Sequence, residues 1–209
     1  MNQSHQPLLP EQIYHLFSRG VGNEKLFLSP ENYLFFLQKL KQHTSGVCEF
    51  YAYSLLPNHF HLLVKMKQED EVRKQFEIIK KIKFNPLEHD VCDFIMERFS
   101  NFLNSYSKAF NKVYKRKGAL FMDYLKRSIV NKSSDFTSYI WYIHKNAVHH
   151  QLAKSIGTWK YDSYQSLISV APTALLRNEL MEWFGGREAF IKFHQQSIDL
   201  KIQISDTDL

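Results

Sequence analysis

Residues 47–66, VCEFYAYSLLPNHFHLLVKM, contain the two apolar runs that decide the fold. The first run, at residues 47–56, has the apolar and aromatic character of a buried strand. Pro57 and Asn58 break it, and residues 59–66, HFHLLVKM, form a second run of strand character. A break this short predicts neighbouring antiparallel strands joined by a tight turn.

The segments on both sides of this pair predict a ferredoxin-like order of elements. Residues 13–20 are typical of a strand, and Pro30 opens a helix over residues 30–43. A long helix, a strand and a further helix are expected at residues 91–115, 119–130 and 135–152. This order predicts an α+β fold with a ferredoxin-like split β-α-β-β-α-β core and an antiparallel sheet. We expect the core and its last helix at residues 11–152, and a partly helical C-terminal extension at residues 153–209.

The composition excludes several classes of protein. The chain has 209 residues, of which 44% are hydrophobic and 23% charged, so it is long and apolar enough to fold without disulfides. Cys48 and Cys92 have no metal-binding spacing, no apolar run is long enough to span a membrane, and no signal-peptide pattern is present. These features predict a cytoplasmic protein. The net charge of +6 weakly favours a polyanionic partner.

His59 and His61 begin the second strand of the pair. Side chains i and i+2 of a strand point to one face, so the two imidazoles project together and Phe60 points to the other face. Two imidazoles can hold a divalent metal, but they are too few for a closed structural zinc site. They suit an open catalytic site that another residue, a substrate or water completes. The alternative is that both are ordinary surface or core histidines.

The helix expected at residues 135–152 carries a second candidate group. Tyr142 and Asn146 are four residues apart and share one helix face. A tyrosine hydroxyl is a nucleophile only with help from a metal or a base, and an amide oxygen one turn away is a candidate third ligand for that metal. Tyr139 is a competing nucleophile, and a purely structural aromatic face is the alternative reading. His144 is interpreted as structural or solvent-facing, with contact to the metal or substrate as the alternative. The seven other histidines, including His149 and His150 at the helix end, are interpreted as incidental.

A basic stretch follows the long helix, at the corner before the last strand. It is interleaved with aromatic residues, among them Tyr114, Phe121 and Tyr124, so it can neutralise phosphates and stack on unpaired bases. A solvated helix end next to core aromatics is the alternative. Farther on, Tyr161 and Tyr164 near Trp159 are expected to pack the extension onto the core. The basic residues are Lys112, Lys115, Arg116, Lys117, Lys126 and Arg127.

Several segments together resemble a known family. PNHFHLLV resembles the HUH signature (histidine, bulky hydrophobic, histidine) of single-tyrosine transposases, and YIHKNAV resembles the YIHxNPV helix of their REP-associated, RAYT-like branch. YHLFSRGVGNEKLF and YKRKGALFMDYLKRSIV are similar to further segments of these proteins, so the resemblance covers residues 11–165. Ala147 stands where the family often has proline, and Met122-Asp123 departs from a glutamine-containing pattern.

The resemblance implies a Mg²⁺- or Mn²⁺-dependent enzyme that cleaves single-stranded or hairpin DNA and transfers the strand through a 5′-phosphotyrosine. His59 and His61 match the metal ligands, Tyr142 the nucleophile and Asn146 the third polar group of the site. It also implies that residues 11–152 are the catalytic domain, with a monomeric or homodimeric protein that is nucleoid-associated when bound to DNA. A domesticated DNA-binding protein without catalysis and a metal-dependent hydrolase in which Tyr142 is structural are the alternatives.

Overall fold

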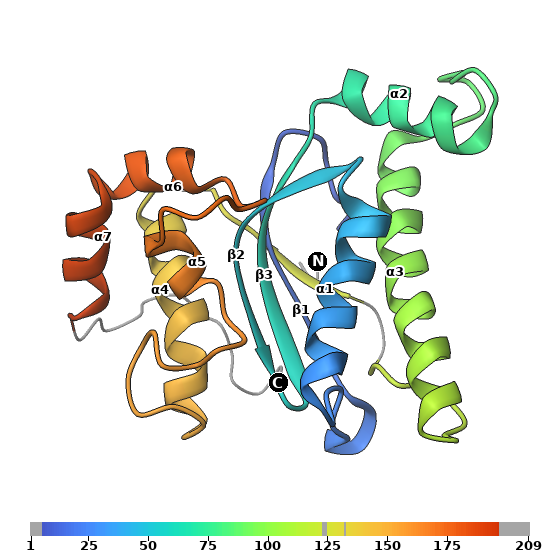
Figure 1. The fold of residues 1–209 in the computed structure, drawn as a ribbon. Coiled ribbons are helices and arrows are strands. Elements are labelled where there is room, and N and C mark those ends of the chain that lie inside the picture. The colour runs from blue at the N-terminus through green and yellow to red at the C-terminus, as the bar shows by residue number, and fades with distance from the viewer. Residues whose placement is uncertain (1–5, 123–124, 132, 197–209) are drawn as a thin grey trace.

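The computed structural model describes residues 6–122, 125–131 and 133–196. Within them, the strands form one antiparallel sheet in the order β2-β3-β1-β4 (Figure 1). This is the sheet order of a ferredoxin-like split unit, so the predicted fold class is confirmed. The strands are β1 (Ile13–Arg19), β2 (Cys48–Leu56), β3 (His59–Met66) and β4 (Lys126–Ile129). β4 is shorter than the strand predicted at residues 119–130, of which residues 123–124 lie outside the described part.

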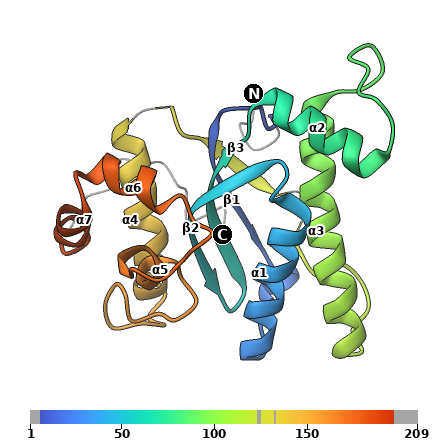
Figure 2. The same cartoon turned by 45° about the horizontal axis from the view of Figure 1, so that its top comes forward.

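Helices cover both faces of the sheet. The first face carries α1 (Pro30–Thr44) and α3 (Val91–Val113), which lie side by side in both ribbon views (Figures 1 and 2). α4 (Ser133–His149) packs against β2 and β3 on the second face. The remaining helices are η2 (Val21–Asn23), a 3-10 turn, α2 (Glu69–Lys80), α5 (Tyr164–Ile168), α6 (Arg177–Phe184) and α7 (Arg187–His194). None of the helices described is both long and apolar enough to cross a membrane.

The central strand β3 distributes its side chains between the two faces. Phe60 and Leu62 belong to the apolar cluster beneath α1 and α3, whereas Leu63 belongs to the cluster beneath α4. By the same alternation His59 and His61 face α4. All of β3 except Lys65 is buried, as expected of a strand with layers on both sides.

Local sequence determines where the two helices of the first face begin. Pro30 occupies the first turn of α1, and Ser29 and Asn32 form a reciprocal capping box there. Asp90 caps α3 by accepting hydrogen bonds from the backbone N–H groups of Cys92 and Asp93, at 2.6 and 3.3 Å. These caps fix the starts of both helices against the sheet.

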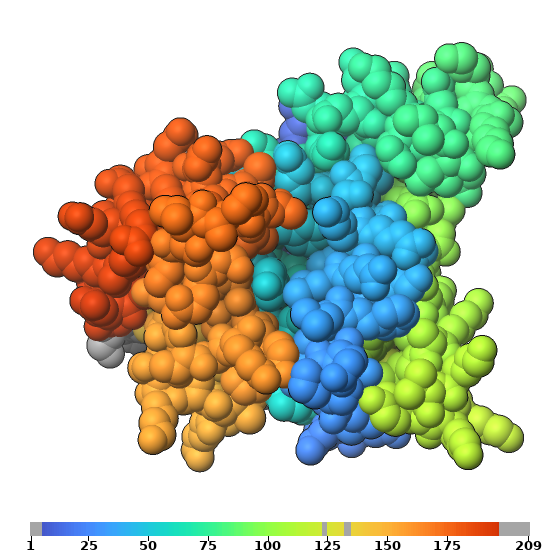
Figure 3. All heavy atoms as spheres, in the orientation of Figure 1, coloured from blue at the N-terminus to red at the C-terminus, as the bar shows by residue number. Residues whose placement is uncertain are grey.

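The extension closes the outer edge of the sheet. The backbone N–H of Leu55 in β2 donates to the carbonyl of Tyr161, and the N–H of Ser163 donates back to the carbonyl of Tyr53, both at 3.0 Å. Tyr161 also stacks on Tyr33 of α1, and Tyr164 is buried, which confirms the predicted packing of these tyrosines. Figure 3 shows orange atoms of the extension next to the blue atoms of α1, whereas its red atoms lie at the left edge of the molecule, away from α1. An edge strand that is covered in this way no longer offers free backbone groups to another chain.

A chain of hydrogen bonds ties α4 to the extension through two buried histidines. His194 Nδ1 lies 2.8 Å from the carbonyl of Phe190, so it donates, and His194 Nε2 must accept from His144 Nδ1 at 2.9 Å. His144 Nε2 then accepts from the hydroxyl of Ser163 at 2.9 Å. Both imidazoles are neutral in this arrangement. His144 is therefore structural, one of the roles that the sequence left open for it.

We expect Phe190→Ala to destabilise the whole protein. Phe190 is fully buried in the cluster that also contains Ile140 and Leu63, so its removal leaves a cavity beside α4. The loss in unfolding free energy should be about 3–5 kcal/mol, measured by urea unfolding with tryptophan fluorescence. Val170→Ala is the control, because Val170 is 98% exposed. A separate unfolding transition for the extension would show that it does not share a core with the sheet.

We also expect the unfolding free energy to fall between about pH 6.5 and pH 4. Burial lowers the pKa of His194 to about 4 and that of His144 well below its usual 6.5, so the unfolded chain binds more protons in this window. Burial raises the pKa of Asp162 to about 7, so this carboxyl alone would increase the unfolding free energy as the pH falls. We expect the combined effect of the buried histidines to exceed that of this one group. Urea midpoints at pH 7.5 and pH 5 test this, and His194→Gln should reduce the difference. Equal midpoints would contradict it.

Candidate active site

The first and third residues of β3 bring two imidazoles to the face beneath α4. His59 is 3% exposed and His61 is fully buried, and their ring centroids lie 5.3 Å apart. Nε2 of His61 is buried and has no hydrogen-bond partner among the described residues. Nε2 of His59 lies 3.0 Å from Oδ1 of Asn146 on α4. The predicted trio of His59, His61 and Asn146 therefore meets at one place in the structure.

His59 is flanked by two amide oxygens. Its Nδ1 lies 2.8 Å from Oδ1 of Asn58, and its Nε2 lies 3.0 Å from Oδ1 of Asn146. Burial lowers the pKa of His59 to about 4, so the ring is neutral at pH 7 and donates only one hydrogen bond. In one of the two contacts, an amide oxygen therefore faces an unprotonated ring nitrogen, and no hydrogen bond joins the two atoms. A cation between His59 Nε2 and Asn146 Oδ1 satisfies both atoms, as does rotation of the Asn146 amide.

The donor set is suited to a divalent cation of borderline character. In the described residues, no group of three or more histidine, cysteine, aspartate or glutamate side chains has a metal-binding arrangement. The Asn146 amide oxygen is thus the candidate third protein ligand, beside the two imidazoles. Burial also lowers the pKa of His61 well below its usual value, which keeps the ring in the neutral form that a metal requires. The residues fit a cation, with positions left open for water or a substrate.

Tyr142 lies one turn before Asn146 on α4 and faces the imidazoles. Its ring meets that of His61 edge-on, at a centroid distance of 5.4 Å and an interplanar angle of 88°. Tyr139, the competing candidate, packs instead against His15, at 5.0 Å. Of the two tyrosines, Tyr142 is the one whose ring contacts a histidine of the HxH pair. Its side chain is 9% exposed.

The sequence did not single out His15, His150 or Arg19 as site residues. His15 on β1 is fully buried, with Nε2 2.9 Å from Nδ1 of His61. The exposed His150 lies beside His59, at 4.8 Å between ring centroids. Arg19 is the partner of His59 in the β1–β3 register. Strand alternation places His15 and Arg19 on the same face of β1. Only the register of β1 against β3 shows that this face carries the HxH pair.

The six predicted basic residues occupy three different environments. Lys112 is exposed in the last turn of α3, and Lys115 and Lys117 are exposed at the corner that follows. Lys126 lies on the face of the HxH pair, with Nζ 5.9 Å from the ring centroid of Phe17, which is the sheet partner of His61. The other two, Arg116 and Arg127, make contacts inside the protein. Of the aromatics between these residues, Phe121 is buried, Tyr114 packs against the core, and Tyr124 lies outside the described residues.

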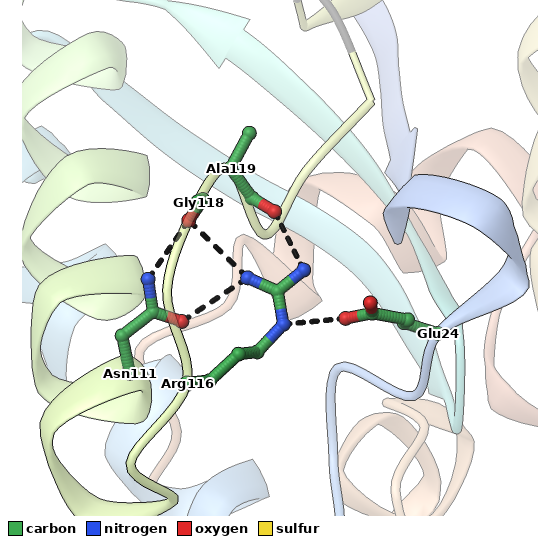
Figure 4. Close-up of polar contacts among 5 residues, drawn as sticks. All are labelled: Glu24, Asn111, Arg116, Gly118 and Ala119. Carbon is green, nitrogen blue, oxygen red and sulfur yellow. Dashed lines mark hydrogen bonds and ion pairs between the residues drawn. The ribbon is translucent and has the colours of Figure 1, made fainter.

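Arg116 holds the corner together (Figure 4). Its guanidinium donates to the carbonyls of Gly118 and Ala119, at 3.2 and 2.7 Å, and to the side chain of Asn111 at 3.2 Å. It also forms an ion pair with Glu24, at 2.5 Å. Arg127 is only 6% exposed and contacts Met96 of α3. Their part in DNA binding stays a prediction, as does that of the four lysines.

Comparison with known proteins identifies a solved structure with a similar fold. No protein-family model matches the chain, and neither does any curated protein. Among solved structures, it is similar to a REP-associated tyrosine transposase bound to a REP hairpin, with a TM-score of 0.60. The two chains share a fold. The likeness covers 82% of this chain and 89% of that one at 12% sequence identity, and it confirms the predicted resemblance at the level of the fold.

We expect Arg116→Ala and Lys117→Ala to differ in stability although each removes one positive charge. Arg116→Ala breaks the contacts that hold Gly118, Ala119 and Glu24 and should lower the unfolding free energy by about 1–2 kcal/mol. Lys117→Ala should change it by less than about 0.5 kcal/mol, because Lys117 is exposed. Urea unfolding measures both variants. Equal stability would show that the Arg116 contacts are energetically neutral.

Proposed function

We propose that this protein is a metal-dependent transesterase that cleaves and joins single-stranded DNA, as a transposase does. One observation carries the proposal: His59, His61, Asn146 and Tyr142 converge on one face of a sheet with the fold of a hairpin-bound tyrosine transposase. The proposed enzyme would act as a monomer or a homodimer.

His59, His61 and Asn146 would hold the cation. A bound divalent cation neutralises the charge of the scissile phosphate and makes its phosphorus more electrophilic. Mg²⁺ prefers oxygen ligands, and two imidazoles are softer than its usual set. We therefore expect Mn²⁺ to support activity at least as well as Mg²⁺.

Tyr142 would supply the nucleophile. Its phenolic oxygen attacks the phosphorus, and the bond from phosphorus to the 3′-oxygen of the preceding nucleotide breaks. The products are a 5′-phosphotyrosine and a free 3′-hydroxyl, which receives the proton that the phenol loses. Attack by the same or another 3′-hydroxyl reverses the step and joins the strands. The phosphodiester energy is kept in the tyrosine ester, so no ATP is required.

The substrate would run from the basic corner to the HxH face. The exposed Lys112, Lys115 and Lys117 suit the phosphates of a hairpin or single strand, and Lys126 and Arg19 lie nearer the imidazoles. Such a protein acts in the cytoplasm and is nucleoid-associated while bound to DNA. DNA binding without catalysis is the second candidate, because Tyr142 is 9% exposed and a phosphate has to reach its hydroxyl.

We expect Tyr142→Phe to abolish covalent attachment to DNA. The wild-type protein, incubated with Mn²⁺ and a labelled hairpin with single-stranded flanks, should give a protein–DNA adduct on a denaturing gel. Tyr142→Phe should give none, since it lacks the attacking oxygen. Tyr139→Phe is the matched control on the same helix and should retain the adduct.

The other outcomes identify the alternatives. Cleavage that persists in Tyr142→Phe, with no adduct in the wild type, would indicate water as the nucleophile and a metal-dependent hydrolase. Hairpin binding without cleavage in Mg²⁺ or Mn²⁺ would indicate a DNA-binding protein that lacks catalysis.

A further inference from the structure

His15 lies in the centre of the sheet and contacts the HxH pair from the neighbouring strand. Its ring is parallel to that of His61, with an interplanar angle of 6° and centroids 5.1 Å apart. Nε2 of His15 lies 2.9 Å from Nδ1 of His61, and both side chains are fully buried. Water therefore does not compete for this hydrogen bond.

The direction of the hydrogen bond determines what His61 can bind. A neutral imidazole carries its proton on one nitrogen only. If His61 Nδ1 donates to His15, the lone pair of His61 is on Nε2, the buried atom without a partner. If His15 donates instead, the proton of His61 is on Nε2, and this atom cannot bind a metal. A ligand histidine commonly depends on such an acceptor behind it.

We propose that His15 is a positioning residue that accepts a hydrogen bond from His61 Nδ1 and thereby holds His61 Nε2 ready for the metal. This inference rests on the proposed function, because it concerns the same metal site. His15 is not a ligand itself, since its Nε2 is engaged with His61 and no three-histidine cluster suited to a metal exists in the described residues.

Packing alone does not account for a histidine at this position. Nδ1 of His15 is buried with no hydrogen-bond partner in the part of the chain that the structure describes, and an unpaired buried polar atom is destabilising. The neighbours of His15 include Phe17 and Tyr139, an environment in which an aliphatic side chain would pack at no such cost. A histidine at residue 15 should therefore lower the stability of the protein while it supports metal binding, and an experiment can separate the two effects.

The experiment compares His15→Leu and His15→Gln with the wild type in a Mn²⁺ titration of the full chain, followed by electron paramagnetic resonance. Leucine keeps most of the volume and removes the acceptor, so we expect Mn²⁺ affinity to fall about 10–100-fold. Glutamine places an amide oxygen near the position of the histidine Nε2 and should restore most of that affinity. The thermal midpoint of His15→Leu without metal should equal or exceed that of the wild type.

Two further variants separate the possible failures. His59→Ala should abolish specific Mn²⁺ binding, and Phe17→Leu, on the same strand and face as His15 but without a polar atom, should leave the affinity unchanged within about twofold. If His59→Ala loses the metal but His15→Leu keeps wild-type affinity, the role of His15 is overturned and the metal site stands. A lower thermal midpoint with unchanged affinity would show a structural role only. Absence of Mn²⁺ binding by the wild type would overturn both.

Discussion

A central strand has to bury both of its faces, and β3 buries imidazoles on one of them. On the other face, Phe60 and Leu62 are covered by apolar side chains at no polar cost. Beneath α4, the ring nitrogens of His59 and His61 lose their water and need partners inside the protein. Asn58, Asn146 and His15 contact three of these four nitrogens, each from a different element, and Nε2 of His61 is left without a partner among the described residues. The orientation of α4 over the sheet is thus constrained by hydrogen bonding as well as by packing.

The extension follows from the character of α4. This helix has no wide polar face: Phe136, Tyr139, Ile140 and Ile143 are all buried. A sheet covers only one side of such a helix, and the other side needs a second apolar layer. Leu180 and Phe190 of α6 and α7 belong to that layer, and Glu179 reaches past it to Tyr51 and Lys65 of the sheet. The extension therefore fixes the helix that carries Tyr142 and Asn146.

Much of the fold was predictable from periodicity, because β3 and α3 have strong patterns of their own. The pairing of His59 with His61 and of Tyr142 with Asn146 was also predictable, since strand and helix spacing place each pair on one face. The contact of His15 with His61 was not, because it depends on the register between β1 and β3. Nor was the role of Arg116, whose partner Glu24 is distant in sequence. The sequence shows only a positive charge at Arg116, as at Lys115 and Lys117, and does not show which of the three is engaged inside the protein.

The inward contacts of Arg116 and Arg127 change what the net charge of +6 means for a polyanion. Counterions leave a nucleic acid only where a cation actually reaches a phosphate, and each such contact adds about 0.7–0.9 to the logarithmic salt slope of binding. A guanidinium already engaged with carbonyls or buried beneath a helix contributes little to that slope. If the protein binds DNA as proposed, the ionic-strength dependence of that binding should thus count mainly the exposed lysines of the corner, so that the salt response is shallower than the sequence charge implies.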